Sequence, residues 1–267
     1  MFNNSMDTRT ALRLAAMCGQ SYTQLAQGTE SVILPAAYRI VTPFTANSAF
    51  GGRELFGFIT ESDSQIVIVF RGTSTTSDWI SDAIARQTDY PYAKDGGLVH
   101  QGFLDIYQSA RKQIVTAMSK LSPQKQLYLT GHSLGGSLAT LCAADLATNT
   151  KFRDPSVYTF GSPRVGNTTF AGQFNRKTGP HYRVYNRNDM VPSLPPLVYK
   201  SPRTGDLYHY IHVKKAVELD FPTGSFAGNH AVSSYFTELA KLDPKYAKLL
   251  CAKTPGFCPE INGYSVP

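Results

Sequence analysis

The chain has 267 residues, of which 42% are hydrophobic and 12% aromatic. This composition is typical of a folded globular protein and excludes a disordered one. The formal net charge is +7, but the basic residues are scattered and form no run or helix face, so no nucleic-acid partner is expected. No apolar run approaches the roughly 18 residues that cross a membrane. Residues 1–7 lack the basic and apolar regions of a secretory signal.

The first part of the chain predicts two helices and three strands. Apolar residues at helical spacing indicate helices over residues 7–20 and 102–121. Strands are expected over residues 38–42, 54–60 and 65–70, with a hairpin turn between the last two. The strand at 65–70 is a nearly continuous β-branched run, which is typical of a strand buried on both faces.

Residues 74–86 contain the only tryptophan of the chain. Ser77 is a suitable N-cap for a short helix with one apolar stripe, formed by Trp79, Ile80, Ala83 and Ile84. One interpretation is an ordinary core helix. The other is a lid, whose stripe covers a pocket in water and turns towards lipid when the lid opens. The position directly after a turn suited to an oxyanion keeps the lid interpretation open.

The most informative stretch is 127–136, Leu-Tyr-Leu-Thr-Gly-His-Ser-Leu-Gly-Gly. An alternating apolar run ends at Thr130, and small and apolar residues at helical spacing follow the second glycine. Strand, sharp turn and helix predict a nucleophile elbow, with Ser133 on an unusual backbone. Gly131 and Gly135 allow strand and helix to approach closely. The alternative is a glycine-rich loop that merely begins a helix.

Further strands are expected at 156–160 and 181–185. The alternation of strands and helices predicts an α/β fold with a mostly parallel central sheet and helices on both faces. No repeat, linker or low-complexity tract divides the chain, so residues 1–267 are expected to form a single domain.

A serine nucleophile needs a base, and the base needs an orienting acid. In an α/β-hydrolase both follow the serine, the acid before the histidine. Asp189 follows the strand at 181–185, at the sheet edge where catalytic side chains gather, and is the favoured acid. Asp206 and Asp220 are weaker rivals in irregular segments. The alternative role for Asp189 is that of an ordinary turn residue.

The favoured base is His230, which follows Gly-Asn in an expected loop and precedes a helical run. His181 comes before the acid, so the expected order excludes it. His209 and His212 lie in a strand-like stretch, and a spacing of three does not place both on one strand face, which argues against a metal pair. One of these two is expected to be a structural histidine near the site.

The oxyanion donors are expected on either side of the serine. One is the backbone N–H of Leu134, the residue after the nucleophile. The other is Thr73, which follows the 65–70 strand and brings an N–H and a hydroxyl. Chemistry of this kind requires no metal and no cofactor.

Two cysteine pairs have different surroundings. Cys18 and Cys142 lie in apolar helical patterns and are expected to pack in the core. Cys251 and Cys258 bracket a Pro/Gly loop, where either a local disulfide, indicating an oxidising compartment, or two free thiols is consistent with the sequence.

Together these motifs resemble the fungal-type class 3 triacylglycerol lipases, a family that includes related feruloyl esterases. The resemblance runs from about residue 54 to residue 236, in the family's order. It is carried by the segments 68–73, 78–82, 99–107, 130–136, 158–167, 188–192 and 229–236.

The resemblance implies an α/β-hydrolase fold with a short helical lid at 74–86. It also implies a nucleophile, an acid, a base and two oxyanion donors, which are the residues favoured above: Ser133, Asp189, His230, Thr73 and Leu134. The lid that it implies is of the lipase type, with Trp79, Ile80 and Ile84 facing substrate. Family members are secreted, whereas the N-terminus shows no signal, which leaves a cytoplasmic location open.

Two departures from the family concern the surroundings of the acyl pocket. Asn229 stands where family members often carry an aspartate before the histidine. Val213-Lys214-Lys215 stands where the family continues with glycine and an acidic residue.

The sequence therefore predicts a lipase that cleaves acylglycerol esters at an oil–water or membrane interface. A feruloyl or short-chain carboxylesterase and a phospholipase of the same fold are the alternatives. A catalytically silent interaction protein is a third, against which the intact serine, aspartate and histidine speak. Nothing in the sequence indicates the oligomeric state.

Overall fold

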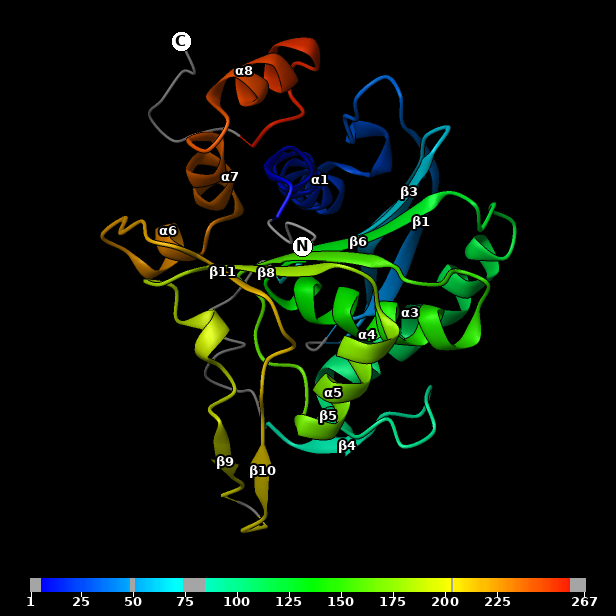
Figure 1. Cartoon of the computed structure of the whole chain (residues 1–267), viewed down its shortest axis with the longest axis vertical. Coiled ribbons are helices and arrows are strands. Elements are labelled where there is room, and N and C mark those ends of the chain that lie inside the picture. Colours follow the sequence, from blue (N-terminus) through cyan, green and yellow to red (C-terminus); the bar gives the residue numbers. More distant parts are fainter. Residues whose placement is uncertain (1–5, 49–50, 74–84, 203, 260–267) are drawn as a thin grey trace, which may run out of the picture.

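A computed structural model describes residues 6–48, 51–73, 85–202 and 204–259. Within these residues the centre is a seven-stranded sheet in the order β1-β2-β3-β6-β7-β8-β11 (Figure 1). The parallel part consists of β3 (Gln65–Phe70), β6 (Gln126–His132), β7 (Ser156–Phe160), β8 (His181–Asn186) and β11 (Ala216–Leu219). At one end, β1 (Arg39–Asn47) and β2 (Arg53–Glu61) are antiparallel. The expected α/β architecture with a mostly parallel sheet is confirmed.

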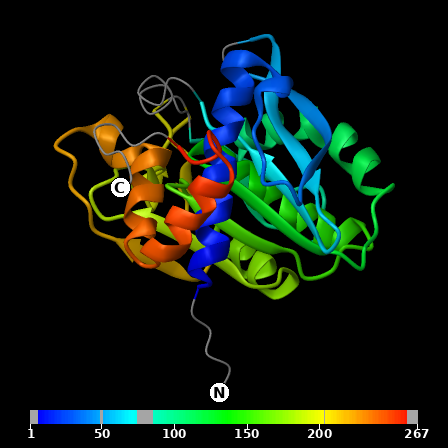
Figure 2. The same cartoon turned by 90° about the horizontal axis from the view of Figure 1, so that it is seen from above.

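Helices cover both faces of this sheet. One face carries α1 (Thr8–Gln27), α7 (Val232–Ala240) and α8 (Pro244–Lys253), and the other carries α3 (Gln101–Met118), α4 (Leu134–Asn149) and α5 (Thr168–Lys177) (Figure 1). Figure 2 shows α1 crossing the sheet beside α7 and α8.

Strand β3 shows how the two cores arise. Val67 and Val69 pack into the cluster beneath α1, whereas Ile66, Ile68 and Phe70 pack into the cluster with α3 and α4. Successive side chains of a strand point to opposite faces of a sheet, so a continuous apolar run fills both cores. The prediction that this strand is buried on both faces is confirmed.

Two predicted elements were too short. Helix α1 does not end near residue 20 but continues to Gln27, because Gly28, with φ of 93°, is the first residue that breaks it. Ser21 and Gln24 are buried on this extra length. Strand β1 runs through Pro43 to Asn47, which is tolerated because β1 is an edge strand and needs no donor there.

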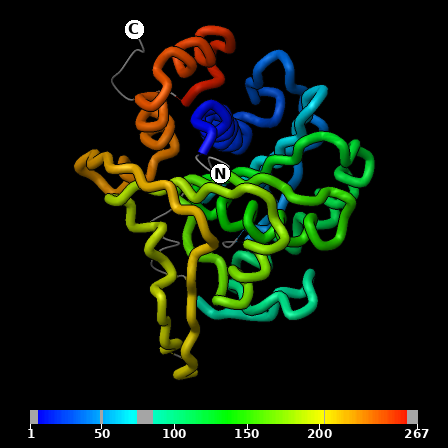
Figure 3. Tube along the Cα trace, in the orientation of Figure 1, coloured from blue at the N-terminus to red at the C-terminus, as the bar shows by residue number. Residues whose placement is uncertain are grey.

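The remaining elements are short. They are η1 (Thr29–Ser31), β4 (Gln87–Asp89), β5 (Leu98–His100), η2 (Val191–Ser193), β9 (Val198–Lys200), β10 (Leu207–His209) and α6 (Phe226–His230). Strands β9 and β10 form a separate antiparallel hairpin that the sequence did not predict. In the tube view of Figure 3 this hairpin extends well away from the sheet.

Two of the four cysteines are free thiols and two form a disulfide. Cys18 and Cys142 are free and buried, as expected. Cys251 and Cys258 are joined in a disulfide that closes the turn after α8. None of the described helices is long and apolar enough to span a membrane.

Candidate active site

The turn between β6 and α4 has the geometry of a nucleophile elbow. Ser133 is the single residue between strand and helix, with φ of 58° and ψ of −131°, a backbone conformation that costs a non-glycine residue about 1–3 kcal/mol. A Cβ at Gly131 would lie 2.2 Å from the backbone of Gly135, so the chain can fold back here only with glycine. This close approach and the backbone of Ser133 fit the predicted elbow.

The predicted acid and base form a buried pair. Asp189 lies in the turn after β8, and its Oδ2 accepts a hydrogen bond from His230 Nδ1 at 2.6 Å. The two side chains are 1% and 8% exposed. Because Nδ1 carries the hydrogen, Nε2 is left as the acceptor of the ring.

His230 is not in a loop, as the sequence suggested, but is the last residue of α6. This short helix begins after Ser225, whose hydroxyl accepts a hydrogen bond from Gly228 N at 3.1 Å. The serine supplies an N-cap that the expected loop did not take into account. The base is consequently held at a defined helix end.

Contacts around the elbow bring His230 to the serine. The ring of His230 lies 4.6 Å, between centroids, from the ring of His132, the residue before Ser133. The end of β7 contacts both the serine and the acid–base pair. On the serine side, Phe160 O accepts a hydrogen bond from Ser133 N at 2.9 Å. A Cβ at Gly161 would lie 3.0 Å from Asp189 Oδ2 and 3.1 Å from His230 Cε1.

Three buried polar atoms of the candidate site make no hydrogen bond to the described part of the chain. They are Ser133 Oγ, His230 Nε2 and Thr73 Oγ1. A buried polar group without a partner costs about 1–3 kcal/mol, and a catalytic role is one reason why a protein retains such a group. In their predicted roles the three atoms are the candidate nucleophile, base and oxyanion donor, which is the set that acyl transfer needs.

The candidate oxyanion donors lie in two segments next to the same serine. Leu134 is the first residue of α4, where backbone N–H groups have no intrahelical partner and the helix dipole favours negative charge. The turn after β3 packs against the elbow, since a Cβ at Gly72 would lie 3.0 Å from Ser133 Cβ. Thr73 follows directly in that turn.

The comparison with known families agrees with this geometry. The family model described as Lipase (class 3) matches residues 67–199, about half of the chain. The chain belongs to the class 3 lipase family. The matched segment includes the candidate nucleophile, acid and oxyanion donors, whereas His230 lies beyond it.

Similar proteins include fungal lipases. The chain is 38% identical to a lipase of Rhizomucor miehei over 154 residues, which cover 55% of this chain and 42% of that protein. It is 37% identical over 147 residues to a secreted mono- and diacylglycerol lipase of Fusarium solani, with coverage of 54% and 43%. The chain thus spans less than half the length of these two curated relatives.

Solved lipase structures resemble this chain over most of its length. A triacylglycerol lipase whose catalytic centre is described as a serine protease triad is 28% identical, with a TM-score of 0.64 and coverage of 78% of both chains. The predicted α/β-hydrolase fold is confirmed.

Sequence reasoning gave no role to two residues that hold the acid. Asp189 Oδ2 also accepts a hydrogen bond from Tyr235 OH at 2.7 Å, and Oδ1 accepts from Val191 N at 2.9 Å. The Tyr235 hydroxyl accepts in addition from Asn186 N at 2.9 Å. Burial and then the charge of Asp189 raise the pKa of Tyr235 well above its usual value. Tyr235 lies in a segment that resembles the family, but its position five residues after His230 gave no reason to expect a contact with Asp189.

A second missed pair connects α1 to the elbow. The Tyr22 hydroxyl and His132 Nδ1 are 2.7 Å apart, and His132 Nε2 lies 2.6 Å from the carbonyl oxygen of His230. Burial, and then the charge of His230, lower the pKa of His132 well below its ordinary value. A neutral His132 accepts from Tyr22 and donates to the His230 carbonyl. Tyr22 lies on the part of α1 that the sequence did not predict.

The rival residues have other partners. His212 Nε2 lies 2.7 Å from Pro192 O, and burial and then Arg183 lower its pKa to about 3, as suits a structural histidine. Asp206 accepts from Thr204 on the β9–β10 hairpin. Asp220 accepts from Asn188 at 2.8 Å.

Three further expectations concern the surroundings of the site. The predicted lid residues Trp79, Ile80 and Ile84 lie outside the residues that the structure describes. No group of three or more His, Cys, Asp or Glu side chains in the described ranges is placed to hold a metal ion.

Asn229, which replaces the family's aspartate, donates to Asn188 O at 3.1 Å and accepts from Thr223 N at 2.8 Å. It therefore connects the segment of the base to the turn of the acid.

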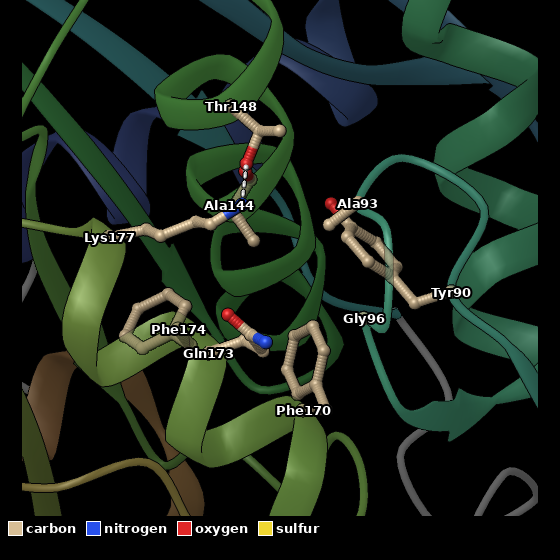
Figure 4. A pocket seen from close by; sticks show the side chains of 9 residues that line it. All are labelled: Tyr90, Ala93, Gly96, Ala144, Thr148, Phe170, Gln173, Phe174 and Lys177. Carbon is tan, nitrogen blue, oxygen red and sulfur yellow. Dashed lines mark hydrogen bonds between the residues drawn. The ribbon is translucent and has the colours of Figure 1, made fainter.

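A shallow pocket between α4, α5 and the loop after β4 lies apart from this site (Figure 4). None of its lining residues belongs to the candidate site, and Thr148 within it donates back to the Ala144 carbonyl of its own helix at 2.8 Å. Lys177 Nζ also donates to Thr148 Oγ1 at 3.4 Å, so these two polar groups of the lining bind each other, and we interpret the pocket as a packing hollow. It is lined by Tyr90, Ala93, Gly96, Ala144, Thr148, Phe170, Gln173, Phe174 and Lys177.

Proposed function

We propose that the chain is a serine carboxylic-ester hydrolase that cleaves acylglycerols through an acyl-enzyme intermediate. The observation that carries the proposal is the buried Asp189–His230 pair, which leaves Nε2 without a partner beside the strained Ser133. Membership of the class 3 lipase family and the names of the relatives supply the substrate class.

The reaction follows from the atoms present. His230 Nε2 takes the proton of Ser133 Oγ as this oxygen attacks the ester carbonyl carbon. The N–H of Leu134 and the N–H and hydroxyl of Thr73 hold the negative oxygen that forms. The carbon–oxygen bond to the alcohol then breaks, and His230 gives the proton to the leaving alkoxide. Water, deprotonated by the same nitrogen, releases the fatty acid and restores the serine.

Asp189 acts by fixing the ring of His230 and stabilising its charged form. Its carboxylate accepts three hydrogen bonds, so it has one orientation before substrate arrives. We propose residues 74–86, with Trp79, Ile80 and Ile84, as the lid of this site on the basis of their sequence pattern.

The test compares variants of the triad on dissolved and emulsified esters. Ser133→Ala and His230→Ala should each lower the turnover of p-nitrophenyl butyrate by about 10⁴- to 10⁶-fold, and only the native serine should react with a fluorophosphonate. Loss of activity in His212→Ala together with activity in His230→Ala would overturn the assignment of the base. Saturation on soluble esters without any activity on emulsified triacylglycerol would favour an esterase.

A further inference from the structure

The β9–β10 hairpin projects from the molecule on the side of α6, below η2 in Figure 1. Its base is firmly attached. Tyr210 is fully buried, its N–H donates to Leu197 O at 3.0 Å, and its hydroxyl donates to Ala85 O at 3.0 Å. Gln87 Nε2 donates to His209 O at 2.7 Å. The hairpin is therefore a held element of the fold and not a frayed loop.

From this base outwards the hairpin exposes large apolar side chains. Leu197 is 60% exposed, Val198 53% and Leu207 58%. Adjacent exposed apolar groups of this size are uncommon on a surface that meets only water, and they mark an interaction site. A two-stranded hairpin also gains little stability of its own in water, so the exposure is not explained by the needs of folding.

Apolar groups lie on both faces of the hairpin. The register pairs Leu207 with Lys200 and Tyr208 with Tyr199, so Val198 and Leu207 share one face because side chains alternate along a strand. The stacked Tyr199 and Tyr208 rings lie on the other face, with centroids 6.4 Å apart. A protein partner that packs on the hairpin would cover one of these two faces, whereas insertion into a lipid surface would cover both. Apolar groups on both faces therefore favour a lipid surface.

Two further exposed apolar residues lie on the segments that carry the acid and the base. Met190, 49% exposed, follows Asp189 directly, and Phe226, 74% exposed, begins the helix that ends at His230. Five of the eight exposed large hydrophobic residues of the described chain thus lie on the hairpin or on the segments that carry the acid and the base.

We propose that the β9–β10 hairpin is an anchor that inserts into the lipid–water surface from which the active site draws its substrate. The proposal rests on the proposed function. Tyrosine rings favour the headgroup level of a lipid layer, the long stem of Lys200 lets its charge remain in water, and a net charge of +7 favours anionic headgroups. The family match ends at Tyr199, inside β9, so β10 lies beyond it.

Binding to vesicles tests the anchor without turnover. The Ser133→Ala variant is sedimented with vesicles of phosphatidylcholine and phosphatidylglycerol, alone and combined with Leu207→Asp or with Leu242→Asp. Leu207 and Leu242 are both 58% exposed. Leu242 lies in the connection between α7 and α8, and Figure 1 shows these helices at the end of the molecule opposite the hairpin. Leu207→Asp should weaken binding by about tenfold or more, and Leu242→Asp should leave it unchanged.

Kinetics separates the anchor from the chemistry. With Ser133 intact, Leu207→Asp should lower the rate on emulsified tributyrin and leave the rate on dissolved p-nitrophenyl butyrate unchanged. If Leu207→Asp unfolds, Val198→Asp serves the same comparison.

Two results would overturn the anchor. One is vesicle binding by Leu207→Asp that equals that of its parent. The other is a dimer in sedimentation velocity that this substitution dissolves, which would identify a second copy as the occupant. A chain that hydrolyses no ester but loses vesicle binding through Leu207→Asp would contradict the proposed function alone.

Discussion

Replacing Tyr235 by phenylalanine removes one oxygen atom from the support of the candidate acid. The side chain is fully buried, and its hydroxyl makes two hydrogen bonds, to Asp189 Oδ2 and from Asn186 N. Phenylalanine fills the same space, so the change tests these two bonds and creates no large cavity.

The magnitude follows from the two bonds. A hydrogen bond to a charged group contributes about 1.5–3 kcal/mol, and a buried N–H left without a partner costs about 1–3 kcal/mol. Tyr235→Phe should therefore lower the free energy of unfolding by about 2.5–6 kcal/mol. Asp189 keeps its bonds to His230 and Val191 N, so the triad remains but is less well oriented. We expect kcat on a dissolved ester to fall by about tenfold, equivalent to about 1.4 kcal/mol, with KM unchanged.

The assay pairs urea unfolding with steady-state kinetics, and Tyr107→Phe is the matched control. Tyr107 is also fully buried and donates to a carboxylate, Asp145 Oδ2, at 2.6 Å. That pair joins α3 to α4 and touches no residue of the candidate site. The control should lose stability and keep kcat. A Tyr235→Phe variant with the kcat of the parent, or with a loss below about 1 kcal/mol in stability, would refute this account of the acid.

Two further predictions concern histidines. His100 caps α3 through Nδ1, which accepts from Phe103 N at 3.3 Å, and burial lowers its pKa from 6.5 to about 4. The unfolded chain therefore binds a proton that folded His100 does not between these values, and His100 alone should lower the free energy of unfolding by about 3 kcal/mol from pH 6.5 to pH 4. His132 and His212, whose pKa values burial also lowers, add to this loss. His100→Asn, which keeps a capping acceptor, should flatten this part of the pH profile in urea titrations, and an unchanged slope would contradict the assignment. Tyr22→Phe removes the partner of His132 Nδ1. Loss of one hydrogen bond, worth roughly 0.5–1.5 kcal/mol, should lower kcat on a dissolved ester about three- to tenfold. Unchanged kcat would show that α1 does not position the base.

The strand, turn and helix around Ser133 could be predicted from the sequence because their determinants are local. A positive φ at Ser133 and the close approach at Gly131 are requirements of one turn, and glycine is the residue that satisfies such requirements. The β-branched run of β3 and the chain order of acid and base are likewise visible without coordinates.

What the sequence could not predict depends on contacts between distant segments. Tyr235 reaches Asp189 across 46 positions, and Tyr22 reaches His132 across 110. Neither tyrosine has a periodicity or motif that signals its partner. The β9–β10 hairpin has strands of three residues, which are too short to show an alternation.

Helices on both faces of the sheet support the candidate site. Helix α4 and its N-terminus lie beneath Ser133, whereas α1 supplies Tyr22 and α7 supplies Tyr235 from the opposite face, where α1 and α7 pack together. The region matched by the family model contains Ser133 and Asp189 but neither His230 nor these two tyrosines. Packing of α1 against α7 therefore helps to set the geometry of the base, because these helices carry Tyr22 and Tyr235, the partners of His132 and Asp189.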